Sequence, residues 1–283
     1  MATTLDKLLA RDIPDVIHTY NEKDVILYAL GVGLGSEPED ESELGFVYEK
    51  ALKVLPTMPV VMGATRIRDL GLDLNYLKIV HGEQSLTLHK VLPSSATVIT
   101  KSRIFGVLDK GVDKGLVVII RREVFEQHSG ERLATSDMSI FARGDGGIGS
   151  TLKEAPSMGV IPERPADLVV DMPTSKRAAL IYRLSGDMNP LHSDPAIARQ
   201  AGFERPILHG LATYGVVGYA VLKHICNNDP GAFKSLKGRF SAPVFPGEKI
   251  QVSVWREAGG VAIRATVPER NVVVFNSGFA DIA

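Results

Sequence analysis

The stretch PILHGLATYGVVGYAVLKHI (residues 206–225) is apolar along most of its length and carries little charge. This composition is typical of a helix that is buried on all sides. The chain that follows, residues 248–282, contains three runs of alternating apolar residues separated by Gly-Gly and PERN turns, which predicts antiparallel strands. A buried helix followed by an antiparallel meander predicts an α+β unit in which the sheet curls around the helix.

The same design occurs earlier in the chain. VILYALGVG around Tyr28 resembles ALIYRLSGD around Tyr182, and these two tyrosines are 154 residues apart. Pro93 and Pro246, which lie in a second pair of similar segments, are 153 residues apart. Two matches at nearly the same spacing indicate an internal duplication. We therefore expect two similar units side by side, each with a helical stretch followed by strands, the first unit having its strands in residues 96–143.

A polar segment rich in glycine and proline, residues 144–167, divides the chain almost in half. Such a composition is typical of a connection between folded units. The expected organisation is a first unit at residues 1–150, a linker at 151–166 and a second unit at 167–283.

The bulk composition fits a soluble globular protein and gives no sign of a charged partner. The chain has 283 residues, of which 45% are hydrophobic and 23% charged, and its formal net charge is −1. This balance argues against binding to nucleic acid or to an anionic membrane. The single cysteine, Cys226, excludes an intrachain disulfide, fits a reducing compartment and is expected to be a buried apolar residue. We expect neither a signal peptide nor a membrane span, and the C-terminus carries no Ser-Lys-Leu-type peroxisomal address.

The polar stretch SGDMNPLHSD (185–194) gathers Asp187, Asn189 and His192 around Pro190. Pro190 disfavours helical angles at Asn189, and a helix is expected to restart immediately after the stretch, so the loop is fixed at both ends. A carboxylate and an imidazole held in this way can bind one water molecule between them and move protons to and from it.

The alternative is that Asp187 and Asn189 only stabilise a turn and that His192 is exposed, because all three residue types favour turns. The duplication argues against it. The spacing of 154 places no equivalent polar groups in the first unit, where the corresponding residues are Gly33, Gly35 and Pro38. The loop of the second unit carries the polar side chains (the equipped loop), and the corresponding loop of the first unit lacks them (the stripped loop). This difference predicts a single active centre, with the first unit free to hold the rest of a substrate.

Gly210 lies at the expected start of the buried helix, where unpaired backbone N–H groups and the positive end of the helix dipole meet. Only glycine lets a substrate oxygen approach such an N–H group closely. We therefore expect Gly210 to donate to a carbonyl oxygen of the substrate. His209, its neighbour, is expected to be structural rather than catalytic.

The segment YRLSGDMNPLHSDPAIA (182–198) resembles the signature of the type 2 enoyl-CoA hydratases, in the MaoC-like branch of the hot-dog superfamily. RPILHG and GRFSAPVFPGE, which follow it, extend the similarity. In the first half, VHGEQSLTLHKVLP and VLDKG resemble the two-domain eukaryotic form, the hydratase 2 part of peroxisomal multifunctional enzyme type 2. The resemblance therefore covers nearly the whole chain.

The resemblance implies a double hot-dog fold, with a long helix wrapped by an antiparallel sheet in each half. It also implies reversible addition of water to trans-2-enoyl-CoA, giving (3R)-3-hydroxyacyl-CoA, in fatty-acid β-oxidation. By this comparison Asp187 and His192 form the catalytic dyad, Asn189 assists them and the N–H of Gly210 binds the thioester oxygen. The implied acyl-CoA contacts are His81, Gly82, Lys110, Met188, Pro190, Leu191 and Phe240.

Other interpretations of these residues stay open. His81 and Gly82 also fit a tight turn, Lys110 a solvated hairpin and Phe240 the core. The alternatives to the hydratase are a dehydratase or thioesterase acting on another acyl-CoA with the same fold, and a non-enzymatic acyl-CoA-binding module. No metal and no cofactor is expected, because the seven histidines include no short ligand pair. A monomer of two hot-dog halves and a homodimer both fit, in the cytoplasm or the peroxisome and not secreted.

Overall fold

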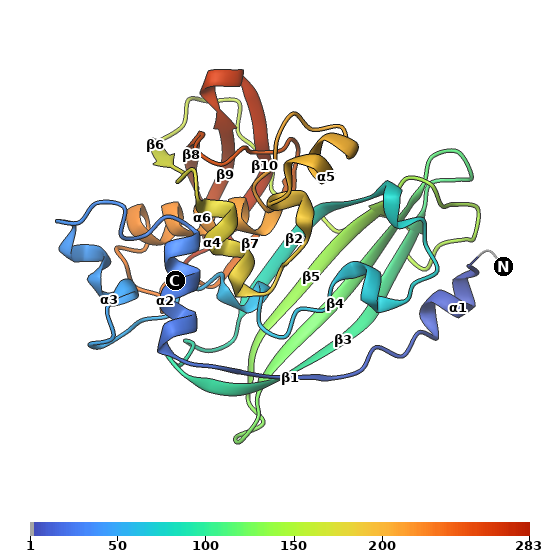
Figure 1. The fold of residues 1–283 in the computed structure, drawn as a ribbon, viewed down its shortest axis with the longest axis horizontal. Helices are drawn as coiled ribbons and strands as arrows, with labels where there is room; N and C mark the ends of the chain where they lie inside the picture. The colour runs from blue at the N-terminus through green and yellow to red at the C-terminus, as the bar shows by residue number, and fades with distance from the viewer. Residues whose placement is uncertain (1–2) are drawn as a thin grey trace.

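The computed structural model describes residues 3–283, and its strands form one antiparallel sheet (Figure 1). The order across the sheet is β1-β3-β4-β5-β2-β7-β10-β9-β8-β6. The strands of the first half are β1 (Val16–Tyr20), β2 (Ile79–Leu88), β3 (Ala96–Asp109), β4 (Leu116–Glu126) and β5 (Arg132–Ala142). Those of the second half are β6 (Leu168–Pro173), β7 (Ser235–Phe240), β8 (Lys249–Glu257), β9 (Gly260–Val267) and β10 (Val272–Asp281).

The order of strands in the second half mirrors that of the first. β2 and β7 pair at the centre, in a register that runs from Glu83 opposite Arg239 to Thr87 opposite Ser235. On either side of this joint, each strand of one half has a counterpart at the same place in the other. This arrangement confirms the double hot-dog fold, with the two units side by side in a continuous sheet.

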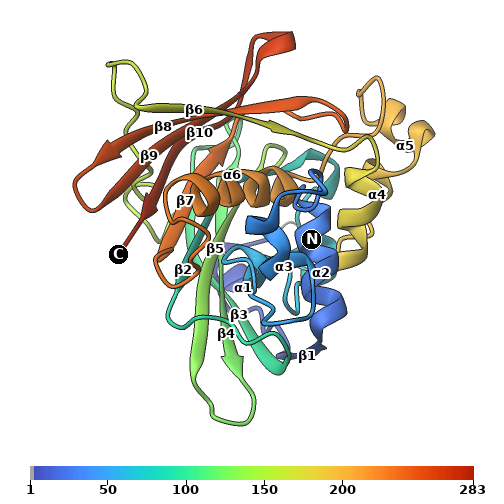
Figure 2. The same cartoon turned by 90° about the vertical axis from the view of Figure 1, so that its left-hand side faces the viewer.

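The helices are short except for α6, which spans Gly210–His224. Figure 2 shows α6 lying against the concave side of the sheet. Eleven consecutive residues of this helix, from Ala212 to Leu222, are buried, as its apolar sequence predicts. The others are α1 (Leu5–Leu9), α2 (Glu22–Gly31), α3 (Leu44–Val47), α4 (Ala178–Tyr182) and α5 (Pro195–Gln200).

The expectation of a long central helix in each half is wrong for the first half. A shift of 154 residues from α6 leads to residues 56–70, which form two short 3-10 turns, Met58–Val60 and Ile67–Leu70, joined by loop. Pro56 and Pro59 lack backbone donors, and Gly63 turns the chain at φ 59°. These residues exclude a continuous helix, so the sheet of the first half wraps around irregular chain instead.

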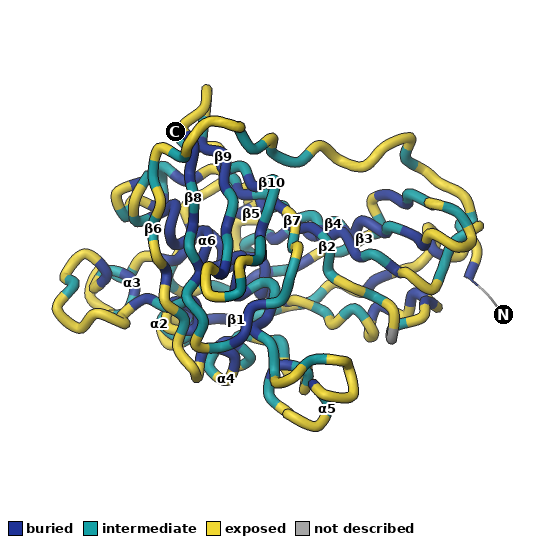
Figure 3. Tube along the Cα trace, turned by 90° about the horizontal axis from the view of Figure 1, so that it is seen from above, coloured by how far each residue is buried: buried dark blue, intermediate teal, exposed yellow. Residues whose placement is uncertain are grey.

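The connection between β5 and β6 is largely exposed and runs along the molecule (Figure 3). None of its residues belongs to a helix or strand. Cys226 is buried, and burial raises the pKa of its thiol to about 11, which fits the expected apolar role. Among the residues described, no helix is both long enough and apolar enough to cross a membrane.

Candidate active site

The polar loop 185–194 is held at both ends by backbone geometry that its sequence dictates. Gly186 turns the chain with φ 131°, a value that side chains rarely permit. At the other end, Asp194 caps α5 by accepting the N–H groups of Ala196 and Ile197, with Pro195 in the first turn. The loop is therefore fixed by local hydrogen bonds and does not depend on a ligand for its shape.

Asp187 and Asn189 make the turn contacts that their types favour. An Oδ1 atom of Asp187 accepts the N–H of Asn189 at 3.1 Å, and Oδ1 of Asn189 accepts the N–H of Leu191 at 3.1 Å. His192, however, is only 7% exposed, so the alternative in which it points into solvent is wrong.

The side chains of Asp187 and His192 approach each other. A carboxylate oxygen of Asp187 and a ring nitrogen of His192 lie within 4.8 Å. His192 Nδ1 donates to the carbonyl of Ile207 at 2.9 Å, which leaves Nε2 without a proton in the neutral ring. Burial lowers the pKa of His192, so the neutral form is favoured at pH 7. The ring can therefore accept a proton from a water molecule beside Asp187.

His209 contacts both of these residues. Its ring stacks on that of His192 with centroids 3.7 Å apart, and its Nε2 donates to the backbone carbonyl of Asp187 at 3.0 Å. Burial, and after it the adjacent His192 ring, lower the pKa of His209 to about 4. His209 is therefore neutral at pH 7 and fixes the backbone from which the Asp187 carboxylate extends, which makes it a positioning residue.

Asp187, His192 and His209 together offer three potential metal-ligand atoms within 4.8 Å of one another, a cluster that the sequence spacing does not reveal. The ring geometry does not suit a metal ion. Lone pairs of ring nitrogens lie in the ring planes, and these two planes are only 27° apart in a stack. Their lone pairs therefore run side by side and do not converge on one ion, and we interpret the cluster as a proton-handling site.

Gly210 begins α6, as predicted, with His209 as the N-cap residue. In the hydrogen bonds formed by residues 3–283, the N–H of Gly210 has no acceptor. A Cβ atom at Gly210 would meet the ring of Phe240 at 3.7 Å, an ordinary contact. The absence of a side chain here is therefore not demanded by protein packing. Gly210 does not itself line the pocket described below, although its neighbour Leu211 does, and its contact with a substrate oxygen stays a prediction.

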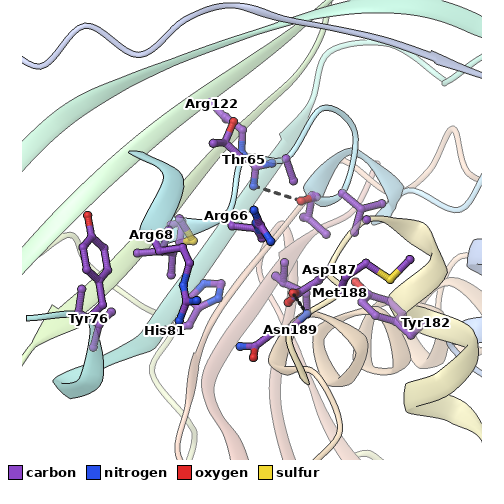
Figure 4. A pocket seen from close by; sticks show the side chains of 18 of the residues that line it. Thr65, Arg66, Arg68, Tyr76, His81, Arg122, Tyr182, Asp187, Met188 and Asn189 are labelled. Atoms are coloured by element: carbon purple, nitrogen blue, oxygen red, sulfur yellow. Dashed lines mark hydrogen bonds between the residues drawn. The ribbon is translucent and has the colours of Figure 1, made fainter. Parts of the chain in front are cut away.

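A pocket of about 260 Å³ lies between the two halves. Figure 4 shows Asp187, Met188 and Asn189 on one side of it and His81 on another. The second half contributes Tyr182, Gly186–Pro190 and Leu211, and the first half contributes residues around 60–68, Tyr76, Ile79, His81, Arg122 and Met138. The stripped first half thus supplies much of the wall facing the equipped loop.

His81 and Phe240 lie together beside this centre, with ring centroids 4.9 Å apart. His81 Nε2 bonds the carbonyl of Glu83 at 3.1 Å, and burial lowers the pKa of His81 to about 4. Gly82 lies at the irregularity of β2 where the register shifts between His81 and Glu83, so it does occupy a local distortion of the strand. These residues are brought close to the Asp187 loop, and their substrate contacts stay a prediction.

The remaining predicted acyl-CoA contacts fall into two groups, those in or next to the pocket and one that lies away from it. Met188 and Pro190 line the pocket, whereas Leu191 is half-buried behind it. Lys110 lies elsewhere, at the end of β3, with its Nζ 4.9 Å from the centre of the Phe141 ring. It does not line the pocket.

Two features of the site escape sequence reasoning. His209 is separated from His192 by 17 positions, and only the fold stacks the two rings. Arg122, on β4, lines the pocket although it is 6% exposed. Its signal in the sequence is a charged residue at a position where the alternation of β4 calls for an apolar one.

Comparison with known proteins agrees with the resemblance of the two halves. Residues 18–144 match the MFE-2 hydratase 2 N-terminal domain, and residues 157–274 match the MaoC like domain. The protein named enoyl-CoA hydratase 2, peroxisomal, from Arabidopsis thaliana is 40% identical over 296 residues, which cover 98% of this chain and 94% of that protein. The chain belongs to the MaoC-like enoyl-CoA hydratase 2 family.

Other members of this family differ in length. Peroxisomal multifunctional enzyme type 2 of Mus musculus is 37% identical over 95% of this chain, which corresponds to 37% of that longer protein. The structure of a MaoC-like dehydratase from Phytophthora capsici superposes with a TM-score of 0.88 at 34% identity and covers 99% of both chains. A Mycobacterium tuberculosis protein described as a double hotdog fold, at 14% identity and a TM-score of 0.54 over 95% of this chain and 93% of its own, shares the fold alone.

Proposed function

We propose that this member of the hydratase 2 family adds water reversibly to trans-2-enoyl-CoA and forms (3R)-3-hydroxyacyl-CoA, as a step of fatty-acid β-oxidation. The observation that carries the proposal is the close approach of Asp187 and His192, with Asp187 lining an interdomain pocket. Relatives named enoyl-CoA hydratase 2 support the same reaction.

Asp187 and His192 hold the attacking water between carboxylate and imidazole. As the oxygen bonds to C3 of the substrate, one water proton passes to the dyad, and Nε2 of His192 is free to receive it. A proton then returns from the dyad to C2 on the same face, which closes the addition without net change in the enzyme.

The N–H of Gly210 is the donor for the thioester oxygen. Negative charge develops on this oxygen when water attacks C3, and a fixed donor at the N-terminus of α6 stabilises that charge. The unused N–H and the absent side chain of Gly210 are the features that suit this role.

The pocket gives the acyl chain a place in the first half. Residues 56–70 form short turns and loop where the second half has a helix, and residues around 60–68 line the pocket from the first half. We therefore expect the enzyme to accept long enoyl chains as well as crotonyl-CoA. His81, Met188 and Pro190 line this route, and Phe240 packs beside it.

The test is a direct assay with trans-2-decenoyl-CoA, in which loss of the enoyl chromophore is followed and the product is resolved by chiral chromatography. We expect the (3R)-alcohol, and Asp187→Asn should lower kcat by about 10²–10⁴ while the melting temperature is kept. Saturated decanoyl-CoA is the control substrate, because only a thioesterase releases free CoA thiol from it. Thiol release, an (S) product, or normal turnover by the Asp187→Asn enzyme each contradicts the proposal.

The compartment and the assembly belong to the same proposal. Relatives named peroxisomal favour the peroxisome or the cytoplasm as the site of this activity. The two fused halves already provide a complete pocket, so catalysis is expected from the monomer and from a homodimer alike.

A further inference from the structure

Arg122 occupies an inward-facing position of β4 that the strand pattern reserves for apolar side chains. Val118 and Ile120 on the same face belong to the apolar cluster at the outer end of the first half. Val124, two residues beyond Arg122, belongs to the main core. The guanidinium therefore lies at the junction of two apolar clusters, and only 6% of the residue is exposed.

The charge of Arg122 has little to compensate it within the protein. Its Nη2 donates to the carbonyl of Val60 at 3.1 Å, whereas its Nη1 is buried and has no hydrogen-bond partner. None of the ion pairs found among residues 3–283 includes this side chain. Burial lowers the pKa of Arg122 to about 10, so the group still carries its charge at pH 7. A buried charge with an unused donor is costly, unless a ligand supplies the acceptor.

Arg122 lines the pocket that Asp187 also lines. Figure 4 shows it entering from β4, with Asp187 and Tyr182 on the other side. Tyr182, whose ring lies against that of Tyr28, lines the same pocket. An unused, charged donor in the wall of this pocket calls for an acceptor on the bound molecule.

The acceptor cannot come from the nucleotide end of CoA. A nucleotide with its phosphates is large and strongly hydrated, and it has to remain near the surface. Arg66 and Arg68, at the rim, are exposed, whereas Arg122 is enclosed. The reacting end of an acyl-CoA lies beside Asp187, its thioester oxygen is assigned above to the N–H of Gly210, and its pantetheine arm runs outward to the nucleotide. The part of the substrate left to reach Arg122 is therefore the acyl chain.

We propose that Arg122 is a specificity residue that binds a carboxylate carried on the acyl chain, so that enoyl-CoA derivatives of dicarboxylic acids are preferred substrates. The inference rests on the hydratase activity proposed above. A carboxylate accepts hydrogen bonds at two oxygens, which matches the free Nη1 of Arg122, and it neutralises the buried charge. An unsubstituted acyl chain has no acceptor oxygen and no negative charge, so it leaves the guanidinium unpaired.

The kinetic test compares plain and ω-carboxylated trans-2-enoyl-CoA substrates of six, eight, ten and twelve carbons. At the chain length that places the carboxylate beside Arg122, we expect kcat/KM for the carboxylated substrate to exceed that for the plain one by about 10- to 100-fold. An ω-hydroxyl series separates charge from simple hydrogen bonding, and we expect less than half of the gain from it on a logarithmic scale. A constant preference for the plain chain at every length overturns the proposal, and an equal gain from the hydroxyl overturns the assignment to a carboxylate.

The variant that decides the matter is Arg122→Met, which keeps an unbranched apolar side chain at this position and removes the charge. We expect it to abolish the preference for the carboxylated substrate, measured as the ratio of kcat/KM for the carboxylated and the plain chain. Replacing an unpaired buried charge by an apolar chain leaves no orphaned charge behind, so the fold should persist. If this variant does not fold, Arg122→Gln, which is uncharged but polar, takes its place.

Arg121→Met is the matched control. Arg121 is the next residue on the same strand but faces the other way, where it pairs with Asp137 at 2.7 Å. Its replacement should leave the ratio of the two kcat/KM values unchanged. An Arg122→Met enzyme with the same ratio as the wild type overturns the proposal.

A binding measurement separates this inference from the proposed reaction. Calorimetry with saturated decanoyl-CoA and its ω-carboxylated counterpart requires no turnover. Arg122→Met should weaken binding of the carboxylated ligand, relative to that of the plain ligand, by about tenfold or more. Such a loss supports the role of Arg122 even if hydration itself is not observed, and equal affinities for the two enzymes contradict it.

Discussion

The two halves of this chain share a sheet design and differ in what they place on it. After α4, the chain turns at Gly186 and presents Asp187 to the pocket. After α2, it turns at Gly33, also with a positive φ of 106°, but the next residue, Leu34, is buried in the core. The turning glycines are 153 residues apart, so Leu34 and not Gly33 stands opposite Asp187, one position from the pairing suggested by the tyrosines.

The second difference concerns the helix. The second half wraps its strands around α6, and the first half has turns and loop in the corresponding residues. The half with the helix therefore has a filled core and a polar loop, whereas the half without it contributes much of the pocket wall. Duplication followed by loss in one copy explains how a single site obtains both a rigid dyad and room for a substrate.

The largest expected effect tests the difference between the two loops. His192→Gln removes the nitrogen that receives a proton, and we expect kcat to fall by about 10²–10⁴. Glu37→Gln, in the exposed loop of the first half, is the control and should leave kcat unchanged. The measurement is steady-state hydration of crotonyl-CoA, with the melting temperature recorded for both variants. Equal losses in the two loops would refute a single active centre.

The next effect concerns two glycines of α6, Gly210, which we expect to make room for the substrate, and Gly215, which packs closely against the first half. The atoms nearest to a methyl group at Gly210 belong to the Phe240 ring, at ordinary contact distances of 3.7–3.8 Å, so Gly210→Ala should fold normally. The added methyl group should push the thioester oxygen of the substrate away from the N–H of Gly210. A misplacement of about 1 Å at the reacting groups should lower kcat by about 10²-fold. A stable enzyme with unchanged kcat shows that the oxygen binds elsewhere.

Gly215→Ala on the same helix is the matched variant, because a Cβ there would lie 2.5 Å from Val32 of the first half. It should lower the melting temperature through overpacking and leave kcat of the folded enzyme unaltered.

Much of the fold was accessible from sequence because its signals are local. The apolar stretch at 206–225 and the alternating runs after it predict α6 and the meander β8–β10, all of which the structure contains. The missing helix of the first half was also visible in Pro56, Pro59 and Gly63, but the duplication argued for symmetry. These three residues prevent a helix despite the duplication, because packing cannot restore the backbone donors that proline lacks.

The site was predictable only where its residues adjoin in sequence. Asp187, Asn189 and His192 fall within six positions, and turn chemistry alone predicts that they share one loop. The stack of His192 on His209 depends on where α6 begins relative to that loop, which no spacing rule states. Arg122 was hidden for another reason, because an inward-facing arginine becomes evident only once the face of β4 is known.

A smaller effect concerns the stability of the stripped loop. Glu43 is buried and its carboxylate accepts from the N–H of Gly35, from Lys223 Nζ at 2.7 Å and from the Tyr219 hydroxyl. It thereby ties the loop of the first half to α6. Glu43→Gln removes the charge that pairs with Lys223, and we expect the free energy of unfolding to fall by about 1–3 kcal/mol. Urea unfolding measures this, and kcat of the folded enzyme should hold, because Glu43 does not line the pocket.

The smallest expected effect is a displaced pH profile. Burial lowers the pKa of His192 below 6.5, so its ring stays neutral and able to accept a proton at pH values where an exposed histidine is already charged. As pH falls, kcat/KM should therefore hold past 6.5 and decline only as the folded pKa of His192 is crossed, and His89→Gln in the first half should not move that decline.

His81 and His209 have folded pKa values of about 4, so the unfolded chain binds more protons than the native one between pH 6.5 and 4. The free energy of unfolding consequently decreases as pH falls from 6.5 to 4. Circular dichroism at each pH must therefore show folded protein before a loss of rate is assigned to the dyad. A decline of kcat/KM centred above pH 6.5 in fully folded enzyme contradicts a buried neutral His192 as the proton acceptor.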